Sequence, residues 1–167
     1  MRIAILGNAG SGKSTLSRRL GQDLTLPVHE VDVFLWQDDW QPAPPETYEA
    51  AHGACLAKER WVLDGMGRMG SLPARLERAT HVILCDYPIW QNFWLLAERQ
   101  AAWAAGTLEA PPGGGGRDAP PTRDLFEAVW QIEQEYMPKV RAMVAACEGG
   151  TVVRRIESFE ALKAFRW

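Results

Sequence analysis

The sequence predicts an α/β fold in which helices cover a five-stranded parallel sheet. Short apolar runs typical of strands recur along the 167 residues, and stretches with helical periodicity lie between them. Three of these runs end in a carboxylate, at Asp32, Asp64 and Asp86. Strands that alternate with helices are typical of parallel sheets with helices on both faces. With 47% apolar residues the chain can bury a substantial core, and we expect one domain over residues 1–167.

The first strand is expected at residues 2–6, RIAIL, and a helix with apolar positions four apart follows at residues 14–24. Between them, GNAGSGKST matches the pattern G-x-x-x-x-G-K-[ST]. Glycines let a backbone bend around phosphates with its N–H groups inward, and the helix N-terminus adds partial positive charge. The alternative, a plain Gly-rich turn, is disfavoured by this context. We expect a phosphate cradle made of Gly7, Asn8, Ala9, Gly10, Ser11, Gly12, Lys13, Ser14 and Thr15.

Two side chains of this cradle carry the expected chemistry. Lys13 can reach the outer phosphates of a nucleotide, and the Ser14 hydroxyl can bind Mg²⁺. ATP and Mg²⁺ are therefore the expected cofactors, with GTP left open as the nucleotide. The sequence lacks the guanine-binding N-K-x-D stretch of GTPases, and ABC- and AAA-type ATPases need longer chains. A small kinase that acts on a small acceptor remains.

The next three strands are expected at residues 26–32, 60–65 and 81–86. Ligands of parallel sheets bind at the carboxyl ends of the strands, so the three aspartates should lie near the cradle. Buried carboxylates repel one another unless a cation lies among them, and Mg²⁺ would supply that cation. The alternative for each is an ordinary strand-end turn or helix cap, and this alternative is favoured at Asp86.

Aromatic residues follow the second strand. Phe34, Trp36 and Trp40 lie close after Asp32, which suits a flat or partly apolar acceptor. The alternative is that they pack a helix onto the sheet. The prolines at residues 44–45 are expected to begin a helix that contains His52 as a surface residue.

Residues 104–124 contain four prolines and five glycines, which excludes a helix or a central strand. We expect a loop inserted between two helices of one domain. A long amphipathic helix is predicted from Thr122 to residue 147, and Pro138 is expected to kink or split it. The fifth strand is expected at residues 151–156.

Three segments resemble adenylate kinases and their relatives. WVLDGMGR at residues 61–68 resembles the LLDGFPR segment of adenylate kinases, and VILCDYP at residues 82–88 resembles the end of their fourth strand. VHEVDVFLWQDDW at residues 28–40 is similar to a narrower branch, the bacterial topology modulation proteins. The resemblance implies a P-loop kinase fold with strand order 2-3-1-4-5.

The resemblance also implies roles for single residues. Asp64 matches the carboxylate that holds a Mg²⁺-bound water, and Arg68 matches the arginine that grips the phosphate of the acceptor. Asp32 matches a position that orients or deprotonates the acceptor hydroxyl. Relatives carry several arginines on the helix after strand four, where this chain keeps Arg99. The implied catalytic set is Lys13, Asp32, Arg68 and Arg99, with Ser14 and Asp64 as the metal ligands.

In the relatives, residues 33–60 correspond to an acceptor flap and residues 104–124 to a lid over the nucleotide. Arg117 and Arg123 could enter the site when such a lid closes. The alternative for the second segment is a surface insertion without a role.

The expected function is transfer of the γ-phosphate of ATP to a nucleotide, nucleoside or other small hydroxyl compound. A nucleotide-binding regulatory protein and a slow nucleoside triphosphatase are the alternatives. The net charge of −3 argues against direct binding of nucleic acid. Three cysteines without metal-like spacing favour a reducing, cytoplasmic setting, and no apolar run reaches the ~18 residues of a membrane span. Oligomeric state is left open.

Overall fold

The computed structural model describes residues 1–37, 40–108, 118–147 and 149–167. Within them, five parallel strands form one sheet in the order β2-β3-β1-β4-β5, which confirms the predicted fold class. β1 lies in the middle, so the loop that follows it opens at the centre of the carboxyl edge. The strands are β1 (Arg2–Gly7), β2 (Val28–Glu30), β3 (Trp61–Asp64), β4 (His81–Cys85) and β5 (Val152–Ile156).

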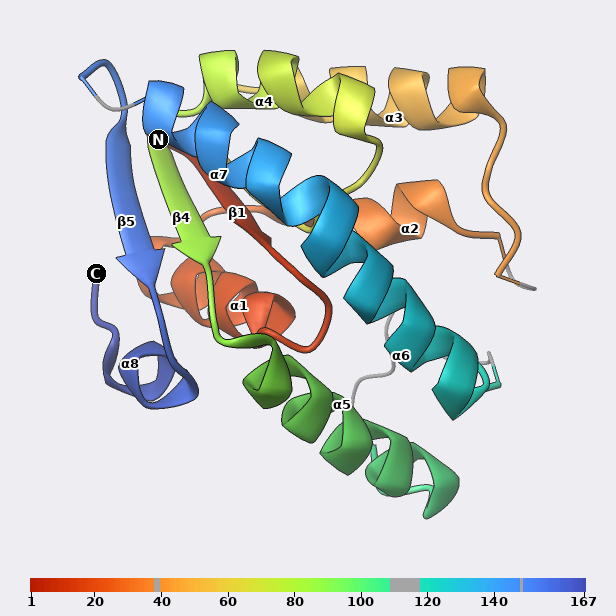
Figure 1. Ribbon diagram of the computed structural model, residues 1–167. Coiled ribbons are helices and arrows are strands. Elements are labelled where there is room, and N and C mark those ends of the chain that lie inside the picture. Colours follow the sequence, from red (N-terminus) through yellow and green to blue (C-terminus); the bar gives the residue numbers. More distant parts are fainter. Residues whose placement is uncertain (38–39, 109–117, 148) are drawn as a thin grey trace.

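Helices cover both faces of the sheet (Figure 1). One face packs against α3 (Pro45–Leu56), α4 (Leu72–Arg78) and α7 (Met137–Ala146). The other face packs against α1 (Lys13–Leu24) and α8 (Phe159–Ala164). The remaining elements are α2 (Val31–Leu35), the 3-10 helix η1 (Met69–Ser71), α5 (Ile89–Ala104), α6 (Thr122–Gln131) and the π-helix η2 (Ile132–Tyr136).

Strand β1 shows why the core has two halves. Ala4 and Leu6 pack with the α3, α4 and α7 side, whereas Ile3 and Ile5 pack with the α1 and α8 side. All four are fully buried, as expected of a parallel strand whose alternating side chains meet a helical layer on each face.

The long helix near the C-terminal end was expected to kink or split at Pro138, and the structure divides it just before that residue. The five-residue π-helix η2 joins α6 to α7, and the N–H of Met137 donates to the carbonyl of Ile132. Proline has no N–H, and its ring clashes with the carbonyl four residues earlier. The wider turn of a π-helix just before Pro138 absorbs this mismatch, so the helix continues.

Helices α5 and α6 extend beyond the carboxyl edge of the sheet side by side, and we call them the α5–α6 arm (Figure 1). The rings of Phe93 and Phe126 lie 5.1 Å apart between them. Gln100 on α5 donates to the carbonyl of Pro120 at 2.8 Å, just before α6. The predicted lid-like loop lies between these helices, and its residues 109–117, which include Arg117, fall outside the described residues.

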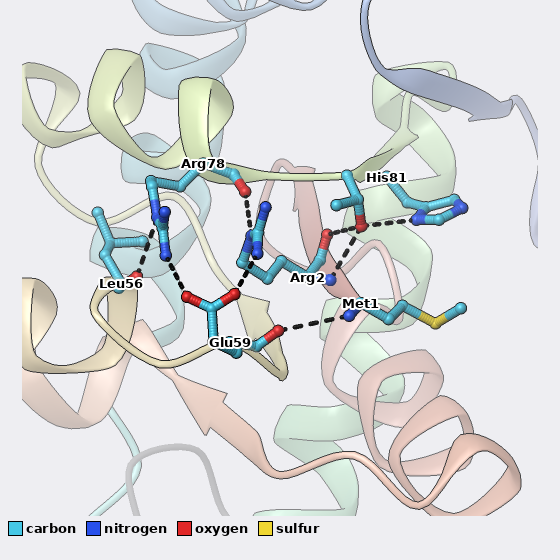
Figure 2. Close-up of polar contacts among 7 residues, drawn as sticks. Met1, Arg2, Leu56, Glu59, Arg78 and His81 are labelled. Carbon is cyan, nitrogen blue, oxygen red and sulfur yellow. Dashed lines mark hydrogen bonds and ion pairs between the residues drawn. The ribbon is translucent and has the colours of Figure 1, made fainter.

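The opposite, amino edge of the sheet is held by a polar network around Glu59 (Figure 2). Its carboxylate accepts from Arg2 at 3.0 Å and from Arg78 at 3.3 Å, and its carbonyl accepts from the N-terminal amine of Met1. Since Glu59 is largely exposed, each pair adds little stability, and the network mainly joins chain segments far from the cradle.

Among the helices that the structure describes, none has the length and apolar character needed to cross a membrane.

Candidate active site

The predicted phosphate cradle connects β1 to α1 at the centre of the sheet. Gly10 and Gly12 have φ values of 75° and 72°, a conformation that favours glycine. A Cβ on Gly10 would lie 2.6 Å from the carbonyl oxygen of Asn92 on α5, so the loop and the helix approach too closely for a side chain there. The strand, loop and helix occur in the order that the sequence pattern requires, and with the strand order they define a P-loop fold.

Lys13 folds over the loop that it follows. Its Nζ donates to the carbonyl of Asn8 at 2.8 Å, and the Ser11 hydroxyl donates to the same carbonyl at 2.8 Å. The first turn of α1 contains no acidic residue, so the lysine charge and the helix N-terminus reinforce each other. This local chemistry fits a polyanion such as a triphosphate.

Asp64 ends β3 beside the cradle and is 3% exposed. Its Oδ2 accepts from the hydroxyl of Ser17 at 2.8 Å. Ser17 is fully buried on α1, three residues after Ser14, and the sequence analysis did not select it. The sequence feature that could have identified Ser17 is its position on the α1 face that carries Leu16 and Leu20, where a buried hydroxyl needs a hydrogen-bond partner.

The oxygens at this point suit magnesium. Ser14 supplies a hydroxyl and Asp64 a carboxylate, which are the hard donors that Mg²⁺ takes alongside phosphates and water. Within the described ranges no group of three or more His, Cys, Asp or Glu residues forms a protein-only metal site. Thr15, the last residue of the predicted cradle, is exposed.

Asp32 lies in the first turn of α2 and is partly buried. Loss of solvent raises its pKa, and the nearby charge of Asp64 raises it further. Lys13 and Arg99 act in the opposite direction, since their positive charges favour the carboxylate. The structure thus brings together Lys13, Asp32, Asp64 and Arg99 in one electrostatic cluster.

Two arginines of the predicted set carry unpartnered nitrogens. Arg68 donates from Nη2 to the carbonyl of Ala43 at 2.6 Å and lies over the ring of Tyr48. Arg99 is partly buried on α5, where burial lowers its pKa and Asp32 raises it. The Nε atoms of both arginines are buried and lack a hydrogen-bond partner among the described residues.

A third arginine, Arg75 on α4, was missed. It is fully buried, donates from Nη1 to the carbonyl of Gly65 at 2.6 Å and donates from Nε to Nε2 of His52 at 3.2 Å. The prediction that His52 is a surface residue is wrong, because the imidazole is 4% exposed and stacks on Tyr48. Burial, and next the charge of Arg75, lower the pKa of His52 to about 4, so it is a neutral acceptor. The four-residue spacing of Tyr48 and His52 on one helix face was the available signal.

Asp86 has a partner that the sequence did not reveal. Arg141 on α7 donates to its two carboxylate oxygens at 2.7 to 3.1 Å, and also to Glu133 at 2.6 Å. Asp86 is therefore balanced by an arginine on α7, a partner that neither the strand-end turn nor the helix cap favoured for it includes. Arg123, which could enter the site if a lid closes, is 86% exposed here and pairs with Glu127 one turn away.

The aromatic residues after β2 join two parts of the fold. The ring of Trp40 lies 6.4 Å from Trp36 and 6.4 Å from Trp103 at the end of α5. Its Nε1 donates to the carbonyl of Asp118, in the C-terminal part of the lid-like segment. These tryptophans pack against one another and onto α5, which differs from the expected alternative of packing a helix onto the sheet.

Comparison with known proteins adds little beyond the fold. No protein-family model matches the chain, and no curated protein matches it. Among solved structures, the chain is similar to one titled shikimate kinase from Aquifex aeolicus. The match has 17% sequence identity and a TM-score of 0.45, and it covers 90% of this chain and 100% of that one. At this level the likeness does not extend to activity.

Proposed function

We propose that the protein is an ATP-dependent phosphotransferase that moves the γ-phosphate to a hydroxyl group of a small acceptor. The observation that carries this proposal is the position of Asp32. It is a carboxylate with a raised pKa that interacts with both Lys13 of the cradle and Arg99 on the arm. A kinase that acts on a hydroxyl uses such a group to orient the acceptor and take its proton.

The cradle residues would hold the nucleotide. Lys13 and the cradle amides would bind the β- and γ-phosphates, and Ser14, with Asp64 acting through water, would hold Mg²⁺. When bound, magnesium triphosphate supplies the phosphoryl group to be transferred. Ser17 keeps Asp64 in place through its 2.8 Å hydrogen bond, which fixes the carboxylate relative to α1.

Asp32 would act on the acceptor. Its raised pKa brings the carboxylate closer to the working pH, which improves a general base. Arg68 and Arg99 would neutralise charge on the transferred group and bind the acceptor. The positive charges of the two guanidinium groups favour an acceptor that itself carries a phosphate or carboxylate.

The motif resemblance supports the same proposal at a finer level. It places the chain with adenylate-kinase-like P-loop kinases and, through residues 28–40, with the topology modulation branch. In this proposal residues 33–60 form the acceptor flap and residues 104–124 the lid of a single domain.

A panel of acceptors with γ-labelled ATP and Mg²⁺ tests the proposal. Nucleoside monophosphates, nucleosides, and phosphorylated or carboxylated hydroxyl compounds are compared with water alone. Label transfer to an acceptor supports the kinase, and Lys13→Ala should abolish it. Lys163→Ala, an exposed lysine on α8, is the matched control and should leave transfer unchanged. ADP release at the same rate with and without every acceptor would contradict the proposal in favour of a triphosphatase, and binding without turnover would favour a regulatory protein.

A further inference from the structure

The first residues of the cradle are fixed by two buried asparagines. Asn8 and Asn92 are each 2% exposed. Asn8 lies in the cradle and donates from Nδ2 to the carbonyl of Val129 on α6 at 2.9 Å. Asn92 lies on α5 and donates from Nδ2 to the carbonyl of Ala9 at 2.9 Å. The two helices of the α5–α6 arm therefore each hold one of two successive cradle residues.

These bonds set the directions of two peptide groups. In a planar trans peptide the C=O and the following N–H point in opposite directions. The carbonyl of Asn8 points to Lys13 and Ser11, so the N–H of Ala9 points the other way, where Oδ1 of Asn8 accepts it at 2.8 Å. The carbonyl of Ala9 points to Asn92 on α5, so the N–H of Gly10 points away from α5.

The pattern decides which cradle amides can bind a phosphate. The Ala9 N–H is already occupied by the side chain of Asn8. The Gly10 N–H has no hydrogen-bond partner among the described residues, and Asn92 holds the other end of the same peptide group, so this N–H remains available to a phosphate. Without Asn92 this peptide group can rotate, and the Gly10 N–H is then no longer held in the orientation that binds a phosphate.

Charged residues behind Asn8 hold α6 at the required place. Glu133 in η2 lies 3.5 Å from Nδ2 of Asn8 and accepts from Arg141 at 2.6 Å. Arg141 in turn donates hydrogen bonds to the carboxylate of Asp86, the residue that follows β4. Since β4 pairs with β1 up to Gly7, where the cradle begins, the helix and the cradle are fixed to the same point of the sheet.

We propose that Asn92 and Asn8 are positioning residues for phosphate binding, which orient the cradle amides from the α5–α6 arm without touching the ligand through their own side chains. The inference rests on the proposed nucleotide site, and it adds that the affinity for a triphosphate depends on the side-chain amides that tie the cradle to the arm.

The test compares Asn92→Leu with Gln100→Leu. Both replace a buried amide on α5 by leucine, but Gln100 bonds to Pro120 and Thr122 within the arm and not to the cradle. Calorimetry with Mg·ATP and with inorganic triphosphate, which has no base or ribose, measures affinity. Asn92→Leu should weaken both ligands about tenfold, the value of one lost charge-assisted hydrogen bond, and Gln100→Leu by less than about twofold.

Amide hydrogen exchange in the nucleotide-free protein separates this inference from the proposed function. Residues 8–14 should exchange faster in Asn92→Leu than in Gln100→Leu, although urea unfolding shows similar losses of stability in both. Equal exchange and equal affinities in the two variants would overturn the positioning role. If wild-type protein bound no triphosphate, the proposed function would fail, and exchange would still decide whether Asn92 orders the loop. Should Asn92→Leu not fold, Asn8→Ala removes the tie to α6 and is measured in the same way.

Discussion

Replacing His52 by glutamine should remove much of the acid sensitivity of the fold. The buried imidazole accepts from Arg75, and its pKa is lowered from 6.5 to about 4, first by burial and then by the arginine. A protonated His52 would place a second positive charge beside Arg75, which holds the carbonyl of Gly65 in the loop after β3. Glutamine can accept the same hydrogen bond through its carbonyl and does not titrate.

Proton linkage gives the direction and the size of the change in the free energy of unfolding with pH. The folded-state pKa of His52 lies below the unfolded value, so between about pH 4 and pH 6.5 the unfolded chain binds a proton that the folded chain does not. The stability contributed by neutral His52 is present above this window and is lost as the pH falls through it. At 1.36 kcal/mol per pKa unit, the loss between about pH 7 and pH 5 is about 2 kcal/mol.

Urea unfolding of both proteins at pH 7, 6 and 5 measures this loss. The pKa values of His29 and His81 are also lowered by burial, but both residues are present in both proteins, so the difference isolates His52. We expect the free energy of unfolding of wild-type protein to fall by about 2 kcal/mol more than that of His52→Gln over this range. Parallel pH profiles would refute the account of the His52–Arg75 pair.

Three further predictions concern the cradle and its surroundings. Gly10→Ala should lower the free energy of unfolding in urea by about 3 kcal/mol, because the residue has a positive φ and lies against α5. The control Gly53→Ala has open space around the added Cβ and should stabilise α3 by up to about 1 kcal/mol. Equal effects of the two substitutions would contradict the packing argument. Arg141→Leu should lower the free energy of unfolding by about 2 kcal/mol, because it leaves two partly buried carboxylates unpaired. The exposed control Arg123→Leu should lower it by less than about 0.5 kcal/mol, and an equally small loss for Arg141→Leu would contradict the prediction. Asp32→Asn should abolish phosphoryl transfer while raising the melting temperature near pH 7, since burial disfavours the charged carboxylate there, and retained transfer would remove Asp32 from the reaction.

The parts of the fold that the sequence predicted depend on local patterns. The cradle motif has fixed spacing and joins a strand to a helix, so neighbouring residues specify it. The position of Asp64 followed from the end of a strand, because a parallel sheet brings its carboxyl ends to one edge. Asp32 was expected to end the second strand, but β2 ends at Glu30 and Asp32 lies in the first turn of α2. The strand order came from the family resemblance, and the structure confirms it.

The parts that the sequence did not predict depend on distant residues. Arg141 meets Asp86 across 55 positions, and Arg75 meets His52 across 23, so no periodic pattern announces either pair. His52 was expected on the surface because histidines usually are, but a fully buried guanidinium requires a neutral acceptor nearby. At Pro138 a kink or a split was expected, but the π-helix η2 that separates α6 from α7 was not.

Titration of the protein with ATP in a calorimeter, with and without Mg²⁺, tests the central claim most directly. The claim is that the cradle and Asp64 form one site for a magnesium triphosphate. We predict saturable binding that Mg²⁺ strengthens, that Lys13→Ala abolishes, and that Lys163→Ala leaves unchanged. Absence of binding by the wild-type protein, or binding that Lys13→Ala leaves intact, would contradict the account.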